Sequence, residues 1–83
     1  MYAIKIIHQA QRDLDQIPAK ILSKISADIL KLKENPRLHS SIKLTQTEGY
    51  RIRIGDYRVL YRIDDKAKEV YIYRIKHRRE VYR

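Results

Sequence analysis

The chain contains the stretch Tyr50-Arg51-Ile52-Arg53-Ile54-Gly55-Asp56-Tyr57-Arg58-Val59-Leu60-Tyr61-Arg62-Ile63, on which the predicted fold depends. Large apolar or aromatic residues alternate with arginines in residues 50–54 and again from residue 57, so each run predicts a β-strand with two unlike faces. Only Gly55 and Asp56 separate the runs, and a two-residue connection of this type is typical of a tight hairpin. If the aliphatic face is covered, the open face carries Arg51, Arg53, Arg58 and Arg62.

Further strands and two helices are predicted on either side of this hairpin. Residues 69–76 are rich in Val, Ile and Tyr and predict a third strand of a meander, although both of its faces look partly apolar and its inward face stays open. Residues 2–7 predict a strand that can join the edge of the sheet. Residues 9–17 and 19–34 show helical spacing, and Pro18 and Asn35-Pro36 end the two helices.

Each predicted helix carries an apolar stripe that must pack against the face of a β-sheet. The second helix carries Ile21, Leu22, Ile25, Ile29 and Leu32. In the first helix, Arg12, Asp13 and Asp15 are predicted to face outward. We therefore expect an α+β fold over residues 1–83 as a single domain, with a small antiparallel or mixed β-sheet and an N-terminal helical hairpin packed on one face. Residues 77–83 show no clear periodicity.

The amino-acid composition excludes several classes of protein. The 83 residues hold 19 Lys and Arg against 10 Asp and Glu, a net charge of +9, and 43% hydrophobic residues argue against disorder. The absence of cysteine excludes disulfides and thiolate chemistry. No apolar run is long enough for a membrane span, and the start lacks a signal-peptide layout, so we expect a cytoplasmic protein with no membrane partner.

The positive charge is concentrated in residues 50–83, which hold eight of the ten arginines and six of the seven tyrosines. Arginine binds phosphate bidentately and tyrosine can stack on bases, so the mixture suits single-stranded RNA. A packed sheet with a solvated arginine face accounts for the same composition. Four guanidiniums on one open face repel one another, however, and this favours an anionic partner.

The residue types favour a metal-free and cofactor-free reaction. His8, His39 and His77 lie far apart, and no metal-binding motif or glycine-rich phosphate loop occurs. Cleavage of RNA by its own 2′-hydroxyl needs only alignment, charge stabilisation, a base and an acid. Arginine suits the charge stabilisation but is a poor base. Tyr82 and His77 remain as candidates for the base, and the sequence leaves the choice between them open.

Several motifs resemble the RelE/ParE toxin superfamily, and within it the RelE branch. They are Ala10…Asp13-Leu14, Asn35-Pro36, Lys43-Leu44, the block from Gly49 to Arg62, and His77-Arg78-Arg79-Glu80-Val81-Tyr82-Arg83. The resemblance implies the toxin of a type II toxin–antitoxin system: a ribosome-dependent endoribonuclease, or mRNA interferase, that inhibits translation by cleaving mRNA in the A site. Its implied partners are a RelB-like antitoxin, mRNA on the ribosome and 16S rRNA.

The resemblance also implies roles for particular residues. Arg58 and Arg78 match arginines that act on the scissile phosphate, and Tyr82 matches a tyrosine that acts on the 2′-hydroxyl or stacks on the base. Arg53 is counted with this catalytic set. We expect RNA binding from Arg51, Arg62, Lys43, His77 and Arg79.

One departure concerns the base, because Arg51 and Arg53 stand where RelE members carry lysines that can lose a proton. The alternatives are a ParE-like DNA gyrase inhibitor and a non-catalytic RNA-binding module.

Overall fold

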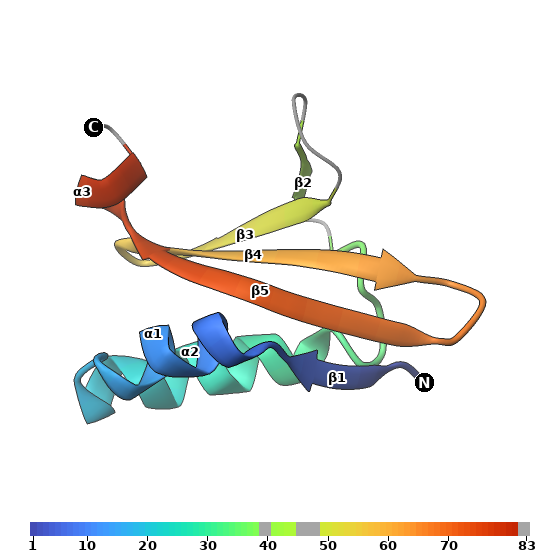
Figure 1. Ribbon diagram of the computed structural model, residues 1–83, viewed down its shortest axis with the longest axis horizontal. Coiled ribbons are helices and arrows are strands. Elements are labelled where there is room, and N and C mark those ends of the chain that lie inside the picture. Colours follow the sequence, from blue (N-terminus) through green and yellow to red (C-terminus); the bar gives the residue numbers. More distant parts are fainter. Residues whose placement is uncertain (39–40, 45–48, 82–83) are drawn as a thin grey trace.

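A computed structural model describes the backbone of residues 1–38, 41–44 and 49–81. Within these residues a five-stranded sheet has the order β1-β5-β4-β3-β2 and lies above two helices (Figure 1). A third, short helix follows the last strand. The elements in chain order are β1 (Ala3–Ile6), α1 (His8–Asp15), α2 (Ala19–Lys31), β2 (Ile42–Lys43), β3 (Tyr50–Ile54), β4 (Tyr57–Asp64), β5 (Glu69–His77) and α3 (Arg78–Val81). The predicted α+β fold is confirmed.

The meander forms as the alternation predicts. Strands β3 and β4 pair antiparallel with Ile54 opposite Tyr57, so Gly55 and Asp56 make a two-residue turn. Gly55 has φ 59°, the positive value that glycine supplies at the first position of such hairpin turns. Strand β5 pairs antiparallel with β4, and β1 joins the free edge of β5 in parallel, which makes the sheet mixed.

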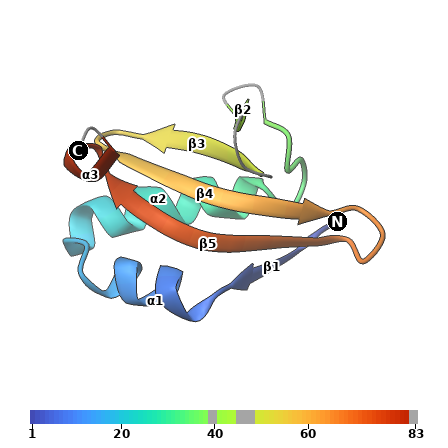
Figure 2. The same ribbon diagram turned by 45° about the horizontal axis from the view of Figure 1, so that its top comes forward.

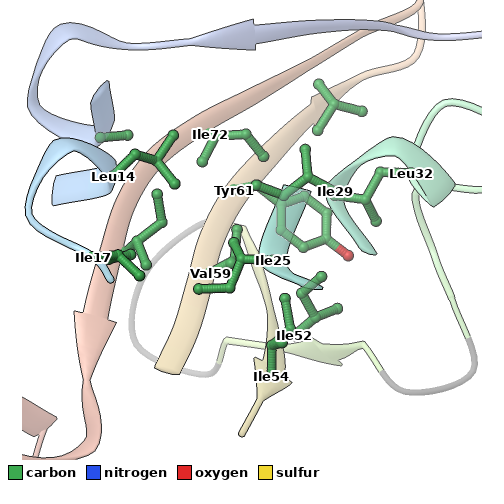
Figure 3. Packing of buried hydrophobic residues seen from close by; sticks show 13 residues of the cluster. Leu14, Ile17, Ile25, Ile29, Leu32, Ile52, Ile54, Val59, Tyr61 and Ile72 are labelled. Atoms are coloured by element: carbon green, nitrogen blue, oxygen red, sulfur yellow. The ribbon is translucent and has the colours of Figure 1, made fainter. Parts of the chain in front are cut away.

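The two long helices cover one face of the sheet (Figure 2). Helix α1 packs against β5, and α2 packs beneath β3. The core lies between these layers, where side chains of both helices meet the inward residues of three strands (Figure 3). The buried members are Ala10, Leu14, Ile17, Ile25, Ile29, Leu32, Ile52, Ile54, Val59, Tyr61, Val70, Ile72 and Ile75.

A β-bulge explains why the inward face of β5 could not be predicted. Leu60 lies opposite Arg74, but the next residue, Tyr61, lies opposite Ile72, so Tyr73 has no partner on β4. The extra residue shifts the alternation by one position. Val70 and Ile72 therefore share the buried face with Ile75 rather than with residue 74.

Other details differ from the sequence-based expectation. Helix α2 ends at Lys31 rather than at residue 34, and Ile21 of its apolar stripe is 39% exposed. Strand β2 and helix α3 were not predicted, because each is too short to show a period. The outward placement of Asp13 was wrong, since its carboxylate binds β5. None of the helices among the described residues has the length and hydropathy needed to cross a membrane.

Candidate nucleic-acid interface

The face of the sheet opposite the helices carries a transverse row of three cations. Arg53 of β3 lies opposite Arg58 of β4, and Arg58 in turn lies opposite Lys76 of β5. Each of the three residues is next to a buried residue in its own strand: Arg53 to Ile52 and Ile54, Arg58 to Val59, and Lys76 to Ile75. Because successive side chains of a strand point to opposite faces, all three side chains point away from the core. Neighbouring strands are about 4.8 Å apart, so the three side chains start within about 10 Å of one another. We call Arg53, Arg58 and Lys76 the cationic row.

Arg78 lies next to this row although it belongs to a different element. Helix α3 starts where β5 ends, and the Arg78 backbone N–H donates to the Asp56 carbonyl in the β3–β4 turn at 2.7 Å. The Arg78 guanidinium lies 3.6 Å from the Asp56 carboxylate. From the other side of the turn, Arg53 Nε donates to the Gly55 carbonyl at 3.3 Å. The turn thus brings Arg53 and Arg78 to the same end of the sheet. Figure 1 shows α3 at that end.

Three of the four predicted catalytic residues are therefore gathered at one end of the open face: Arg53, Arg58 and Arg78. The fourth, Tyr82, lies outside the described residues. Lys76 was missed by the sequence-based analysis, although it lies directly opposite Arg58. The bulge at Tyr73 hid it, because without the bulge the alternation from Val70 would turn Lys76 inward.

The predicted RNA-binding residues are divided between surfaces. Arg51 and Arg62 lie on the same open face as the cationic row, and Arg79 is exposed on α3. Lys43 lies opposite Tyr50, whose ring stacks on the inward Tyr61, so the register directs Lys43 away from the open face. His77 lies opposite Tyr57 on the helix side of the sheet.

Charge is distributed unevenly along the open face. At the end far from the cationic row, Glu69 forms an ion pair with Lys5 at 3.7 Å and accepts a hydrogen bond from Tyr71. That hydrogen bond is the main reason why the pKa of Tyr71 is raised, so the phenol stays neutral near pH 7. Asp64 lies in the same region, opposite Glu69. A polyanion is therefore favoured at the end that carries Arg53, Arg58, Lys76 and Arg78.

Between the two ends the face is partly aromatic. The Arg62 guanidinium lies over the Tyr73 ring, 5.3 Å from its centroid. Both residues line a shallow hollow of about 730 Å³ with Tyr71 and the β4–β5 turn. Arg74, by contrast, is withdrawn from the face because its Nε donates to the Asp13 carboxylate at 2.9 Å. The hollow lies away from the cationic row, and Asp64 and Asp65 balance the charges of Arg62 and Lys66 in its lining. It therefore has no excess positive charge that would favour a phosphate.

These groups can bind and stabilise negative charge without a metal. Among residues 1–38, 41–44 and 49–81, no three His, Cys, Asp or Glu side chains come together as a metal site. Guanidiniums on two strands and a helix can hold the oxygens of a phosphate from several sides. Lys76 adds an ammonium group opposite the guanidinium of Arg58 on the open face.

Comparison with known proteins assigns the family. The sequence profile of the family described as "ParE toxin of type II toxin-antitoxin system, parDE" matches residues 4–82. The Toxin RelG of Mycobacterium tuberculosis is 33% identical over 84 residues, which cover 99% of this chain and 97% of that protein.

Two solved structures are similar in fold as well as in sequence. The toxin–antitoxin complex RelBE2 of Mycobacterium tuberculosis contains a chain with a TM-score of 0.82 and 34% identity, covering 92% of this chain and 96% of that one. The archaeal RelE–RelB complex of Pyrococcus horikoshii gives 0.79 and 28%, covering 93% and 94%. The predicted superfamily is confirmed: this chain belongs to the RelE/ParE superfamily and is the toxin component of a type II toxin–antitoxin system.

Proposed function

We propose that this toxin is a ribosome-dependent endoribonuclease that cleaves mRNA in the A site and thereby inhibits translation in the cytoplasm. The observation that carries the proposal is the cationic row with Arg78 at its end, on a face that the helices leave open. Such a cluster suits a phosphate that gains negative charge during reaction. The 33% identity to Toxin RelG supports the same branch of the superfamily.

The reaction can proceed without a protein nucleophile or a metal. The 2′-oxygen of the RNA forms a bond to the adjacent phosphorus, and the bond from phosphorus to the 5′-oxygen breaks. A base takes the 2′-hydroxyl proton, and an acid protonates the leaving 5′-oxygen. The products are a 2′,3′-cyclic phosphate and a 5′-hydroxyl. Arg58 and Arg78 stabilise the charge on the phosphorane, and Arg53 holds the neighbouring phosphate.

The base is one of two residues in this proposal. Tyr82 follows α3 in the sequence and carries the role that the family resemblance implies. Lys76 is the lysine that the register places beside Arg58. His77 is a weaker candidate than either, because its contact with Tyr57 lies on the helix side of the sheet.

The ribosome and an antitoxin complete the proposal. Free RNA would react slowly, because the ribosome supplies the alignment, for which effective molarities reach roughly 10⁵–10⁸ M. The net charge of +9 suits contact with 16S rRNA as well as with mRNA. Two similar structures are of toxin–antitoxin complexes, so we propose a RelB-like antitoxin whose acidic residues cover the open face.

The experiment is a single-turnover cleavage assay on ribosomes with mRNA in the A site. Arg58→Ala should slow cleavage by about 10²–10³-fold, because it removes a charge partner of the transition state. Arg12→Ala, which removes an exposed arginine from α1, is the matched control and should cleave at the wild-type rate. Lys76→Arg keeps the positive charge, but its side chain cannot lose a proton. This variant should therefore cleave slowly if Lys76 is the base and normally if Tyr82 is the base. Added antitoxin should suppress the wild-type reaction.

The substrate provides the decisive control. A 2′-deoxyribose at the cut site should stop cleavage but permit binding, and its cleavage would contradict the mechanism.

A second function is favoured by the family profile, which is named for the ParE toxin. If the wild type cuts no message but stalls DNA gyrase, the ParE-like function is correct. If it binds RNA and does neither, the protein is a binding module.

A further inference from the structure

His77 occupies the junction between β5 and α3. Its backbone ends the strand, and its imidazole packs edge-to-face on the Tyr57 ring, with centroids 5.0 Å apart and planes at 88°. Tyr57 is its cross-strand neighbour, so both rings project from the same face of the sheet. The imidazole is half-buried, and its orientation is fixed by this contact.

The same imidazole accepts a hydrogen bond from a backbone N–H in the first turn of α3. The first N–H groups of a helix have no partner within the helix. Here the Arg78 N–H donates to the Asp56 carbonyl at 2.7 Å, and the Arg79 N–H donates to His77 Nδ1 at 3.2 Å. A side-chain acceptor on the residue before a helix, bonded to the second helical N–H, is the geometry of an N-cap. Nδ1 accepts only when the ring is neutral and its proton is on Nε2.

We propose that neutral His77 is a positioning residue, which caps α3 and thereby holds Arg78 at the cationic row. The role of Arg78 on RNA rests on the proposed function, whereas the capping rests on the contacts alone. The cap is lost when the ring is protonated, because an imidazolium has no acceptor nitrogen. His77 therefore acts through Arg78 and not on the RNA.

The charged groups around His77 determine how protonation of its ring affects the contacts of Arg78. Among the side chains that the structure describes, they are Asp13 on α1, Lys20 and Lys24 on α2, Asp56 in the β3–β4 turn, and Arg78 and Arg79 on α3. Asp13 already accepts hydrogen bonds from Arg74 and from the Ile75 N–H, both at 2.9 Å. Asp56 lines the same hollow of about 370 Å³ as His77 and lies 3.6 Å from Arg78. An imidazolium would thus compete with Arg78 for Asp56.

Amide NMR tests the cap without RNA. In the wild type, the Arg79 amide shift should change together with the His77 ring signals when acid is added. In His77→Asn the amide should stay protected and show no titration, because asparagine is a favoured N-cap that does not ionise. In His77→Leu, exchange of the Arg79 amide should rise between about twofold and thirtyfold. His8→Asn, at the exposed first residue of α1, is the control and should behave as the wild type.

Cleavage on ribosomes tests positioning against direct chemistry. His77→Leu should lower the single-turnover rate about tenfold, and His77→Asn should restore it to within about threefold of the wild type. As the pH is lowered, the single-turnover rate of the wild type should fall more steeply than that of His77→Asn. Equal losses in the Asn and Leu variants would overturn the proposal, because they would show that an acceptor side chain at the start of α3 is not what the imidazole contributes. An Arg79 amide that ignores the His77 titration would also overturn it. If no message is cleaved at all, the proposed function fails, and the amide measurements alone decide whether His77 caps α3.

Discussion

At the scale of single residues, the two glycines of the chain illustrate different requirements. Gly49 has φ 125° and is buried at the start of β3, where an added Cβ would lie 2.7 Å from the Tyr61 carbonyl oxygen. Its own carbonyl accepts the Leu44 N–H at 2.9 Å, which leads the chain into β3. Gly55 has φ 59°, and nothing lies within 4 Å of an added Cβ. Gly49 is therefore required by sterics and by conformation, whereas Gly55 is required by conformation alone.

This difference predicts unequal costs. Gly49→Ala should lower the free energy of unfolding by at least about 2 kcal/mol, because backbone atoms of β4 cannot move aside cheaply. Gly55→Ala should cost only about 1 kcal/mol, the strain of a left-handed alanine. Urea unfolding followed by circular dichroism measures both values. Equal losses would show that the close approach of Gly49 to Tyr61 is unimportant.

At the scale of elements, β5 shows how one strand edge is closed by two different means. Strand β1 pairs with β5 only as far as Ile72, and the Ile7 N–H still donates to the Ile72 carbonyl at 2.9 Å. Beyond Ile72, α1 lies along this edge of β5. There the Asp13 carboxylate accepts hydrogen bonds from the Ile75 N–H and from Arg74 Nε, both at 2.9 Å. A carboxylate on the helix thus replaces the missing part of β1. This is why Asp13 faces the sheet rather than solvent.

Asp13→Ala should therefore destabilise the protein by about 1–3 kcal/mol, because it leaves a strand N–H and a half-buried guanidinium without their acceptor. Asp15→Ala, two residues away and exposed, is the matched control and should stay within about 0.5 kcal/mol of the wild type. Thermal or urea unfolding measures the difference. A loss in Asp13→Ala no larger than in Asp15→Ala would contradict the role of Asp13 as an edge cap.

At the scale of the whole molecule, one network joins four segments of the chain, through Tyr2, Arg37, Tyr50 and Asp65. Arg37, which follows α2, binds Asp65 of the β4–β5 turn through two hydrogen bonds of 3.1 and 2.8 Å. Asp65 also accepts the Tyr2 hydroxyl at 2.6 Å, and Arg37 Nε donates to the Tyr50 hydroxyl at 3.1 Å. Chiefly through Arg37, and then through Tyr2, these bonds lower the pKa of Asp65 from 3.8 to about 2.

Because the pKa of Asp65 is lowered by folding, the stability of the protein depends on pH in the acidic range. The contribution of Asp65 is fully present above its unfolded pKa of 3.8 and is lost as pH falls toward its folded pKa of about 2. Asp65→Asn should lower the melting temperature at pH 6, and the gap to the wild type should close between about pH 4 and pH 2. Asp15→Asn is the control. A gap that stays constant down to pH 2 would show that the Arg37–Asp65 pair does not respond to acid.

Local sequence patterns were sufficient to predict the central hairpin, the order of most elements and the arginine face. Alternation of residue types is a local property, and it identified β3 over residues 50–54 and the start of β4 at residue 57 without error. The turn chemistry of Gly55-Asp56 then fixed their register. Consequently the sequence alone assigns Arg51, Arg53, Arg58 and Arg62 to one face of the sheet.

Tertiary contacts, in contrast, determine which residues of β5 and α3 join that face. The bulge at Tyr73 arises from pairing between β4 and β5, and a shift of one residue reverses every later side chain. Lys76 and His77 therefore lie on the faces opposite to those that a strand without the bulge would give them. The position of Arg78 depends on Asp56, more than twenty residues earlier in the chain. Periodicity reports only neighbours along the chain, whereas these placements are fixed by hydrogen bonds between segments that are distant in sequence.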